Sequence, residues 1–219
     1  MGEWITISEV DDIIGYFTGA FKDHKFIFLF VMILTIFSLV VPWVTYDTSD
    51  IDMVYEDAYL AQETDFSIIT CLDIITNNVY LNIEAYVLSV FLGYGAIIDT
   101  IVNIGQTGTI SAATQYITGD PFLFIKFTLV HGTLEDISTI LNTFASMILV
   151  YFIIVFTKDA IKPRKIVKRG VLANSWELNQ IHLKQSLIVF VIGIFIMINA
   201  GILEEYISVP IGDFIVSIL

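Results

Sequence analysis

Basic side chains are scarce in this sequence of 219 residues, which has ten Lys and Arg against 23 Asp and Glu and a formal net charge of −13. Binding of nucleic acid needs clustered Lys and Arg to meet the phosphates, so this balance argues against nucleic acid as a partner. Cysteine is also nearly absent. Cys71 has no second cysteine to pair with, so an intrachain disulfide is excluded and cysteine usage does not reveal the compartment.

The sequence also lacks the short motifs of common catalysts. It contains no Walker A sequence, no nucleophile elbow and no H-E-x-x-H zinc motif. Gly93-Tyr94-Gly95 does not fit a nucleotide-binding fingerprint, because that fingerprint needs a strand, a turn and a helix around it. We therefore expect a protein that is not an enzyme.

Apolar residues, in contrast, are abundant and come in long blocks. They make up 56% of the chain, and the mean hydropathy is +0.81. The blocks are about 20 residues long, which is the length that crosses a hydrocarbon layer of roughly 30 Å. A soluble chain of this size could not bury so much apolar surface in one core. The sequence therefore predicts an all-α, polytopic membrane helical bundle, with residues 1–219 forming a single integral membrane domain.

About five transmembrane helices are expected, at residues 26–44, 79–98, 99–117, 133–156 and 186–207. The third is the weakest, because Gly, Thr, Ser, Asn and Gln dilute its Ile and Val, and a re-entrant loop is the competing interpretation. Residues 121–131 are expected to form a short helix or half-helix, and His131-Gly132 to break the helix before the fourth span. Residues 175–184 suggest a short surface helix.

The N-terminal segment at 8–21 predicts an amphipathic helix. Its apolar residues, from Val10 to Phe21, fall on one helical face. Because it is too short and too polar to span, we expect it to lie in the membrane interface or under the bundle. About 25 polar and amphipathic residues precede the first apolar block, so no signal peptide is expected.

The basic residues predict the orientation. Six of the ten lie in the loop at 158–169, which is therefore expected to be cytoplasmic. Counting spans from this loop places the N-terminus, with Lys22 and Lys25, inside. The acidic segment at 45–78 and the C-terminus are then outside. The basic residues at 22–25 and at 158–169 both lie on the cytoplasmic side only if residues 99–117 cross the membrane, so we count five spans. We therefore expect a multi-pass protein of the plasma membrane.

Ionisable side chains at membrane depth are costly, and each one needs an explanation. The candidates in or beside the spans are Glu84, His131, Glu135, Asp136, Glu204 and Glu205. His131 and Glu135 are four residues apart, so a helix places both on one face. With Glu205 from another span, they would offer nitrogen and oxygen ligands to a metal or other cation. Alternatively, His131 and Glu135 hydrogen-bond neighbouring helix ends and lock the break at Gly132.

Asn77 and Asn78 open the second span and are further candidates for this intramembrane polar site. Asn is also a common N-cap, so capping is the alternative role. No cofactor is identified from the sequence. The ligands that the pattern allows are a bound metal or cation and the surrounding lipid.

Three stretches, covering roughly Asn77 to Pro210, form an ordered pattern. Residues 74–78 lead into a span that contains two glycines; residues 129–135 read Leu-Val-His-Gly-Thr-Leu-Glu; residues 200–210 combine small residues, Glu, an aromatic and Pro. This order resembles the stage II sporulation protein M family of bacterial and archaeal membrane proteins, which typically has Pro-His-Gly followed by Glu in the second stretch. Val130 stands where the family has that Pro. By its distance to the final proline, Glu205 is the family-like acid.

The resemblance implies a non-enzymatic membrane scaffold or anchor linked to cell-envelope organisation. In spore formers the family member works with partner proteins in remodelling septal peptidoglycan, whereas many relatives occur in organisms that form no spores. The partners implied are envelope proteins and membrane lipid, and we expect a homo-oligomer. The alternative is a channel or transporter for ions or small solutes that uses Glu84, His131, Glu135 and Glu205, since carriers place their substrates at broken helices.

Overall fold

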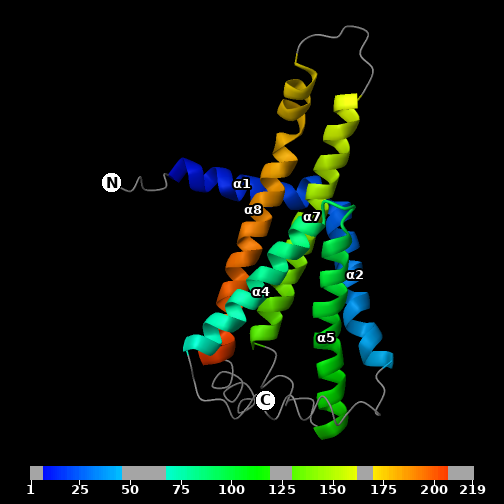
Figure 1. Cartoon of the computed structure of the whole chain (residues 1–219), viewed down its shortest axis with the longest axis vertical. Helices are drawn as coiled ribbons and strands as arrows, with labels where there is room; N and C mark the ends of the chain where they lie inside the picture. The colour runs from blue at the N-terminus through cyan, green and yellow to red at the C-terminus, as the bar shows by residue number, and fades with distance from the viewer. Residues whose placement is uncertain (1–6, 46–67, 119–129, 162–169, 207–219) are drawn as a thin grey trace.

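The computed structural model describes residues 7–45, 68–118, 130–161 and 170–206, which form helices and contain no strand (Figure 1). The helices are α1 (Ile7–Asp23), α2 (Lys25–Thr45), α4 (Ile68–Leu88), α5 (Tyr94–Thr118), α7 (Val130–Ile161) and α8 (Val171–Tyr206). The all-α prediction is therefore confirmed. Helix α1 covers the segment predicted to be amphipathic.

Among the described residues, three stretches are long and apolar enough to cross a membrane: Lys25–Pro42, Gly132–Ile161 and Val171–Glu204. These stretches belong to α2, α7 and α8, as expected for a helical membrane protein. Helices α4 and α5 are more polar and do not reach the same hydropathy over a full span. Composition alone therefore does not establish the predicted number of about five spans.

The long antiparallel pair α7 and α8 forms the axis of the bundle, and α4, α5 and α2 pack along it (Figure 1). Helices α2 and α5 end, and α4 and α7 begin, at what we call the lower end, as drawn in Figure 1. Helix α7 ends and α8 begins at the opposite, upper end. Helix α1 crosses the bundle below this upper end, so α7 and α8 extend past α1 as a helical hairpin.

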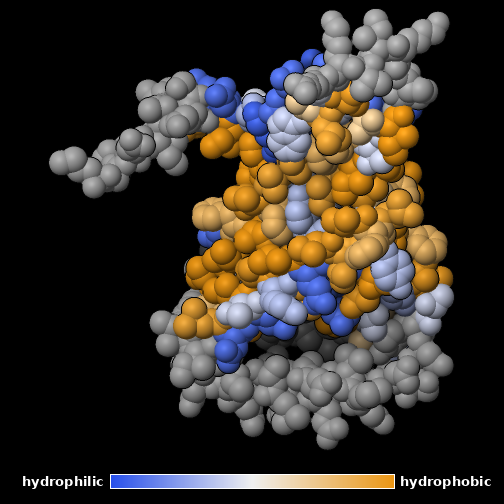
Figure 2. Space-filling view, turned by 45° about the horizontal axis from the view of Figure 1, so that its top comes forward, coloured by the Kyte–Doolittle hydropathy of each residue, from blue (hydrophilic) through white to orange (hydrophobic). Residues whose placement is uncertain are grey.

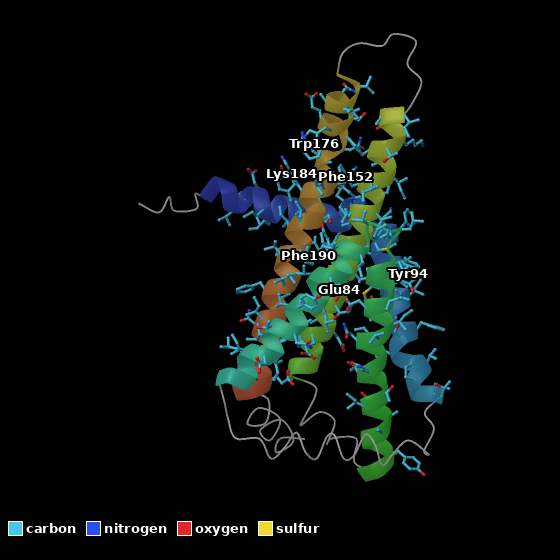
Figure 3. The ribbon with its side chains drawn as sticks, viewed as in Figure 1. Glu84, Tyr94, Phe152, Trp176, Lys184 and Phe190 are labelled. Atoms are coloured by element: carbon cyan, nitrogen blue, oxygen red, sulfur yellow. The ribbon has the colours of Figure 1, made fainter. Side chains whose placement is uncertain are left out.

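The hairpin remains packed above α1. The rings of Phe152 and Trp176 meet edge to face there, with centroids 6.1 Å apart (Figure 3). Asn179 donates a hydrogen bond to Asp159 Oδ2 at 3.1 Å. These contacts keep residues 175–184 in the same helix as the last span. The predicted separate surface helix is therefore wrong, and α8 is continuous from Val171 to Tyr206.

Apolar side chains cover the outside of the bundle. Large exposed examples are Phe26 of α2, Phe91 in the turn between α4 and α5, and Val191 and Phe195 of α8. Figure 2 shows a broad apolar zone across the visible face of the molecule, with hydrophilic residues above and below it. An apolar surface this extensive is typical of a protein whose surroundings are lipid rather than water.

The turn between α4 and α5 lies earlier than predicted. The expected boundary between residues 98 and 99 is wrong, because α4 ends at Leu88 and α5 begins at Tyr94. Leu92 and Gly93 have left-handed φ angles of 58° and 80°, which end helical geometry. The Ser89 hydroxyl then accepts a hydrogen bond from the Ala96 N–H at 2.8 Å, which satisfies one free donor of the new helix. The turn is apolar, so hydropathy does not reveal it.

The predicted helix break at His131-Gly132 is also corrected. Helix α7 begins at Val130 and stays helical through both residues. Gly132 therefore occupies the first turn of α7 and does not interrupt its backbone. The predicted half-helix at 121–131 falls almost wholly outside the described residues.

One face of α7 holds the bundle together through buried polar side chains. We call Ser138, Thr139, Asn142, Thr143 and Ser146 the α7 polar stripe; each is at most 3% exposed. Ser138 donates to the Gly193 carbonyl of α8 at 2.8 Å, and Thr143 bonds to Thr100 of α5 at 2.7 Å. Asn142 donates to Asn82 Oδ1 of α4. Three neighbouring helices are thus tied to α7, in the manner of interhelical hydrogen bonds in lipid.

Small residues let α2 and α5 approach closely. A Cβ atom added to Gly108 of α5 would collide with the Leu39 carbonyl oxygen of α2. Gly105 lies against the same helix, and a Cβ atom added there would lie 3.8 Å from Pro42 Cγ. Gly105 and Gly108 lower the hydropathy of α5, and the same two glycines allow α5 to pack closely against α2.

We predict that Gly108→Ala lowers the free energy of unfolding by about 1–3 kcal/mol, because the Leu39 backbone can yield only if α2 and α5 separate. Gly15→Ala is the matched control: Gly15 is also helical, but a Cβ atom added to it would meet nothing within 4 Å. Alanine there should stabilise the helix by about 0.5–1 kcal/mol. Unfolding of both variants in one detergent measures the difference, and a Gly108→Ala protein as stable as wild type would contradict the close packing.

Candidate functional site

Polar side chains from α4, α5, α7 and α8 surround a cavity of about 240 Å³ toward the lower end of the bundle. This volume holds several water molecules or one small organic group. We call it the lower cavity. Its described lining consists of Asn78, Leu81, Asn82, Asn103, Gln106, Thr107, Ile110, Gly132, Glu135, Asp136, Thr139, Met197 and Glu204.

Three carboxyl groups give the lower cavity its charge. Glu135 and Asp136 come from the start of α7, and Glu204 from the last turn of α8. Both Glu204 and Asp136 act electrostatically on Glu135, so its charged neighbours within the described part of the chain are acids. The described lining contains no Lys, Arg or His. The cavity therefore gathers negative charge without a positive side chain of its own in that lining.

Neutral donors hold the two acids of α7 in place. Asn78 Nδ2 donates to Glu135 Oε1 at 2.9 Å, and the Thr107 hydroxyl donates to Asp136 Oδ1 at 3.2 Å. Helix α4 thus fixes one carboxyl group and α5 fixes the other. Such hydrogen bonds orient a carboxylate but leave its charge uncompensated, so a positive group entering the cavity would find oriented acceptors.

Thr139 adds an unused hydroxyl to the lining. It is 1% exposed and makes no hydrogen bond with any other described residue. Thr143, one turn along α7, has its partner in Thr100. A buried hydroxyl without a partner costs free energy, so the Thr139 hydroxyl is available to a water molecule or a ligand inside the cavity.

The structure brings some of the predicted site residues together. Asn78, Gly132 and Glu135 line the cavity. Asn77 and Glu84 do not: both are exposed on other faces of α4, where Figure 3 marks Glu84. Glu84 lies two residues from the buried Asn82, about 200° around the helix, which explains why the two side chains face opposite directions.

The side chains of His131 and Glu205 lie outside the described residues, although their backbones belong to α7 and α8. The acid of the α8 C-terminus whose side chain is described at the cavity is Glu204. Within the described part of the chain, no group of three or more His, Cys, Asp or Glu is arranged to hold a metal ion. The predicted metal site formed by His131, Glu135 and Glu205 thus stays a prediction.

The neutral lining residues could not be found by following charge along the sequence. On α5 they are Asn103, Gln106 and Thr107. Their spacing of three and four residues places them on one helical face. Residues 99–117, the weakest of the predicted spans, therefore did contain the pattern of a polar helix face. Asn82 and Thr139 carried no comparable signal, because single small polar residues are common in membrane helices.

A second polar cluster lies where α1 meets α7 and α8. We call Asp23, His24, Tyr151, His182 and Gln185 the histidine joint. His24 Nε2 lies 3.1 Å from Gln185 Oε1 and 3.2 Å from His182 Nδ1, and Gln185 Nε2 donates to Asp23 Oδ2 at 2.7 Å. The Tyr151 ring packs edge-on against both imidazoles, with centroids 5.1 Å away. The joint fixes α1 across the bundle.

Burial lowers the pKa of His24 below its ordinary value of 6.5. The hydrogen bond to Gln185 and the charge of Asp23 raise that pKa, while the neighbouring His182 lowers it. The net direction is downward, so the folded joint favours a neutral His24. Its Nε2–H can then donate to the Gln185 carbonyl, whose amide group is already committed to Asp23.

Comparison with known families gives one result that covers most of the chain. Residues 14–209 match the family model described as stage II sporulation protein M. The matched range includes every described residue of the lower cavity and of the histidine joint. Neither the curated proteins nor the solved structures contain a match to the chain.

We predict that the unfolding midpoint of the wild type falls as the pH is lowered through 6.5, the ordinary pKa of histidine. The unfolded chain takes up a proton on His24 there, whereas the folded joint resists it, so protonation favours unfolding. His24→Gln keeps a hydrogen-bonding side chain that does not titrate, and it should flatten this part of the pH profile. Thermal unfolding in one detergent from pH 5 to pH 8 compares the two proteins. Identical slopes would show that His24 does not contribute.

Proposed function

The chain belongs to the stage II sporulation protein M family, and from this premise we propose that it is a non-enzymatic membrane scaffold or anchor linked to cell-envelope organisation. The observation that carries the proposal is the lower cavity, a polar site large enough for a small group at one end of a hydrogen-bonded bundle. A scaffold needs such a place to hold a component of the envelope. Catalytic chemistry is not part of the proposal.

The proposed topology has α2, α4, α5, α7 and α8 crossing the plasma membrane. These helices alternate in direction along the chain (Figure 1). The basic segment at 158–169 favours a cytoplasmic upper end, which places the N-terminus inside and the lower cavity on the outer side. About 20 residues of α7 separate Gly132 from Tyr151 at the level of α1, which corresponds to roughly 30 Å, the thickness of the hydrocarbon layer.

The interior above the lower cavity supports a scaffold more than a conduit. Ser138, Asn142 and Thr143 of the α7 polar stripe are already bonded to other helices. Phe144 and Ile148 are fully buried beside them. A polar group that enters from the lower end meets this packed layer, and the described interior offers it a site rather than a path. Transport through the same acids is the rival function.

The exposed surface of the bundle suggests the kinds of partner that the protein binds. Lipid covers the apolar exterior, and envelope proteins are the partners proposed for the outer end. The α7–α8 hairpin adds surface beyond α1 on the proposed cytoplasmic side. A homo-oligomer belongs to the same proposal.

The topology predicts the outcome of reporter fusions. Reporters inserted at Asp57, Pro163 and Leu219 should read outside, inside and outside, because an odd number of spans separates each position from the next. Paired reporters, one active only in the cytoplasm and one only outside it, measure each site. A cytoplasmic reading at Leu219 would contradict the five-span arrangement.

The scaffold proposal predicts the effect of two matched substitutions in a strain of the source organism that lacks this chain. Envelope morphology should be disturbed in that strain and restored by wild type and by Glu84→Gln, whose site faces away from the cavity. Glu135→Gln should fail to restore it, since the cavity loses a charge. Microscopy of the stained envelope measures rescue.

The rival function is separated from the scaffold in liposomes that contain the purified protein. Flux of protons, Na⁺ or K⁺ should equal that of empty liposomes. Wild-type flux that disappears in Glu135→Gln but persists in Glu84→Gln would contradict the scaffold and establish transport.

A further inference from the structure

We propose that the histidine joint binds a Zn²⁺ ion through His24 Nε2, His182 Nδ1 and Gln185 Oε1. These atoms come from two places far apart in the chain, the junction of α1 with α2 and the helix α8. Figure 3 marks Lys184, next to Gln185 in sequence, where α1 crosses α8. A bound ion would therefore tie α1 to α8. The joint is separate from the lower cavity, so the inference does not rest on the proposed scaffold function.

The spacing of the three atoms fits a tetrahedral ion. His24 Nε2 lies 3.1 Å from Gln185 Oε1 and 3.2 Å from His182 Nδ1. Zinc binds nitrogen and oxygen at about 2.0–2.2 Å, so two ligands of a tetrahedral zinc ion lie about 3.3 Å apart at the shorter bond length. A linear, two-coordinate ion would hold them about 4 Å apart instead. Small side-chain movements bring the joint to the tetrahedral spacing.

The hydrogen bonds of the joint aim the three atoms at one region. Gln185 Nε2 donates to Asp23 Oδ2 at 2.7 Å, which turns the Gln185 carbonyl oxygen toward His24. His24 Nε2 has one bonding direction, yet Gln185 Oε1 and His182 Nδ1 both lie within its hydrogen-bonding geometry. That direction consequently points between the two atoms. An ion bound to all three would lie there.

The three atoms also share too few hydrogens. Gln185 Oε1 can only accept, so it needs the hydrogen on His24 Nε2, and the same hydrogen must serve His182 Nδ1. A hydrogen placed on His182 Nδ1 would face the one on His24 Nε2. A metal ion instead accepts a lone pair from each atom. His24 then carries its hydrogen on Nδ1, so both imidazoles stay neutral and no proton is released.

The donor set selects the kind of ion. Imidazole nitrogen suits Zn²⁺, whereas Mg²⁺ and Ca²⁺ prefer sites built from oxygen. The described residues contain no metal-holding group of three or more His, Cys, Asp or Glu, and here the third ligand is the amide oxygen of Gln185. The lowered pKa of His24 keeps its imidazole in the neutral form that binds metals.

The surroundings of the joint also suit a divalent ion. The charge of Asp23 acts on His24, and the same carboxylate accepts the hydrogen bond that orients Gln185. A carboxylate placed behind a metal ligand fixes the ligand and offsets part of the charge of the ion. His24 is 4% exposed, whereas His182 and Tyr151 are partly exposed, so water can reach the joint and complete the coordination.

The test uses the full-length protein in an uncharged detergent, purified without a histidine tag and stripped of metal with EDTA. The probe is Zn²⁺, with Mg²⁺ and Ca²⁺ as comparisons at equal concentration. An ion that binds only the folded state raises the unfolding midpoint by mass action. We expect a rise with Zn²⁺ alone that saturates at one ion per chain. No rise, or an equal rise with all three ions, would overturn the proposal.

Histidine substitutions locate the ion, because the chain has three histidines. His182→Phe keeps a ring against His24 and Tyr151 but removes the ligand nitrogen, so the affinity for Zn²⁺ should fall at least tenfold. His131→Gln removes the histidine of the metal site predicted from the sequence, and it should bind Zn²⁺ as wild type does. Undiminished affinity in His182→Phe, or an equal loss in His131→Gln, would overturn the assignment.

Gln185→Glu supplies a second test that does not depend on the folding of His182→Phe. A carboxylate is a stronger zinc ligand than an amide oxygen, but it also brings a negative charge next to Asp23. The metal-free variant should therefore be less stable than wild type, and Zn²⁺ should raise its unfolding midpoint by more. A rise equal to or smaller than that of wild type would show that Gln185 holds α1 by hydrogen bonds and binds no ion.

Discussion

A polar side chain at membrane depth must find its hydrogen-bond partner within the protein, since lipid offers none. Ser138, Asn142 and Thr143 of the α7 polar stripe meet this requirement by bonding to α8, α4 and α5. These bonds fix the positions of three helices around one. Toward the lower end the same face of α7 continues into Glu135 and Asp136. Each of these carboxyl groups accepts one hydrogen bond from a neutral side chain of another helix, and the helices leave a cavity between them. The candidate site is therefore the end of the feature that assembles the bundle.

The class of fold could be predicted because block length and helix periodicity are local properties of the chain. Helix boundaries were harder wherever the turn was itself apolar. The α4–α5 turn depends on Leu92 and Gly93 adopting left-handed backbone angles, and nothing in their hydropathy separates them from the flanking helices. Conversely, the polar residues at 175–184 suggested a separate element, although packing against α7 through Trp176 and Asn179 keeps α8 continuous.

The site was partly predictable for energetic reasons. Glu135 drew attention because a carboxyl group in a span needs a partner, and Asn78 proved to be that partner. The energetic cost of a carboxyl group at membrane depth does not predict that Glu84 faces outward, because that direction depends on which face of α4 packs on the bundle. The histidine joint was missed because His24 and His182 are 158 residues apart in sequence, and each alone is an unremarkable basic residue near a helix end.

The length of α7 has a mechanical consequence. Its 32 residues correspond to about 48 Å of unbroken helix, of which the part beyond Tyr151 forms an arm of roughly 15 Å past α1. Helix α8 runs beside it over the same distance. An unbroken α-helix behaves as a stiff rod, so a small change in the angle between the two at the lower end is multiplied by their length at the tip. The pair would work as a lever with its fulcrum at α1, converting a small shift at the lower end into a larger displacement of the hairpin tip at the upper end.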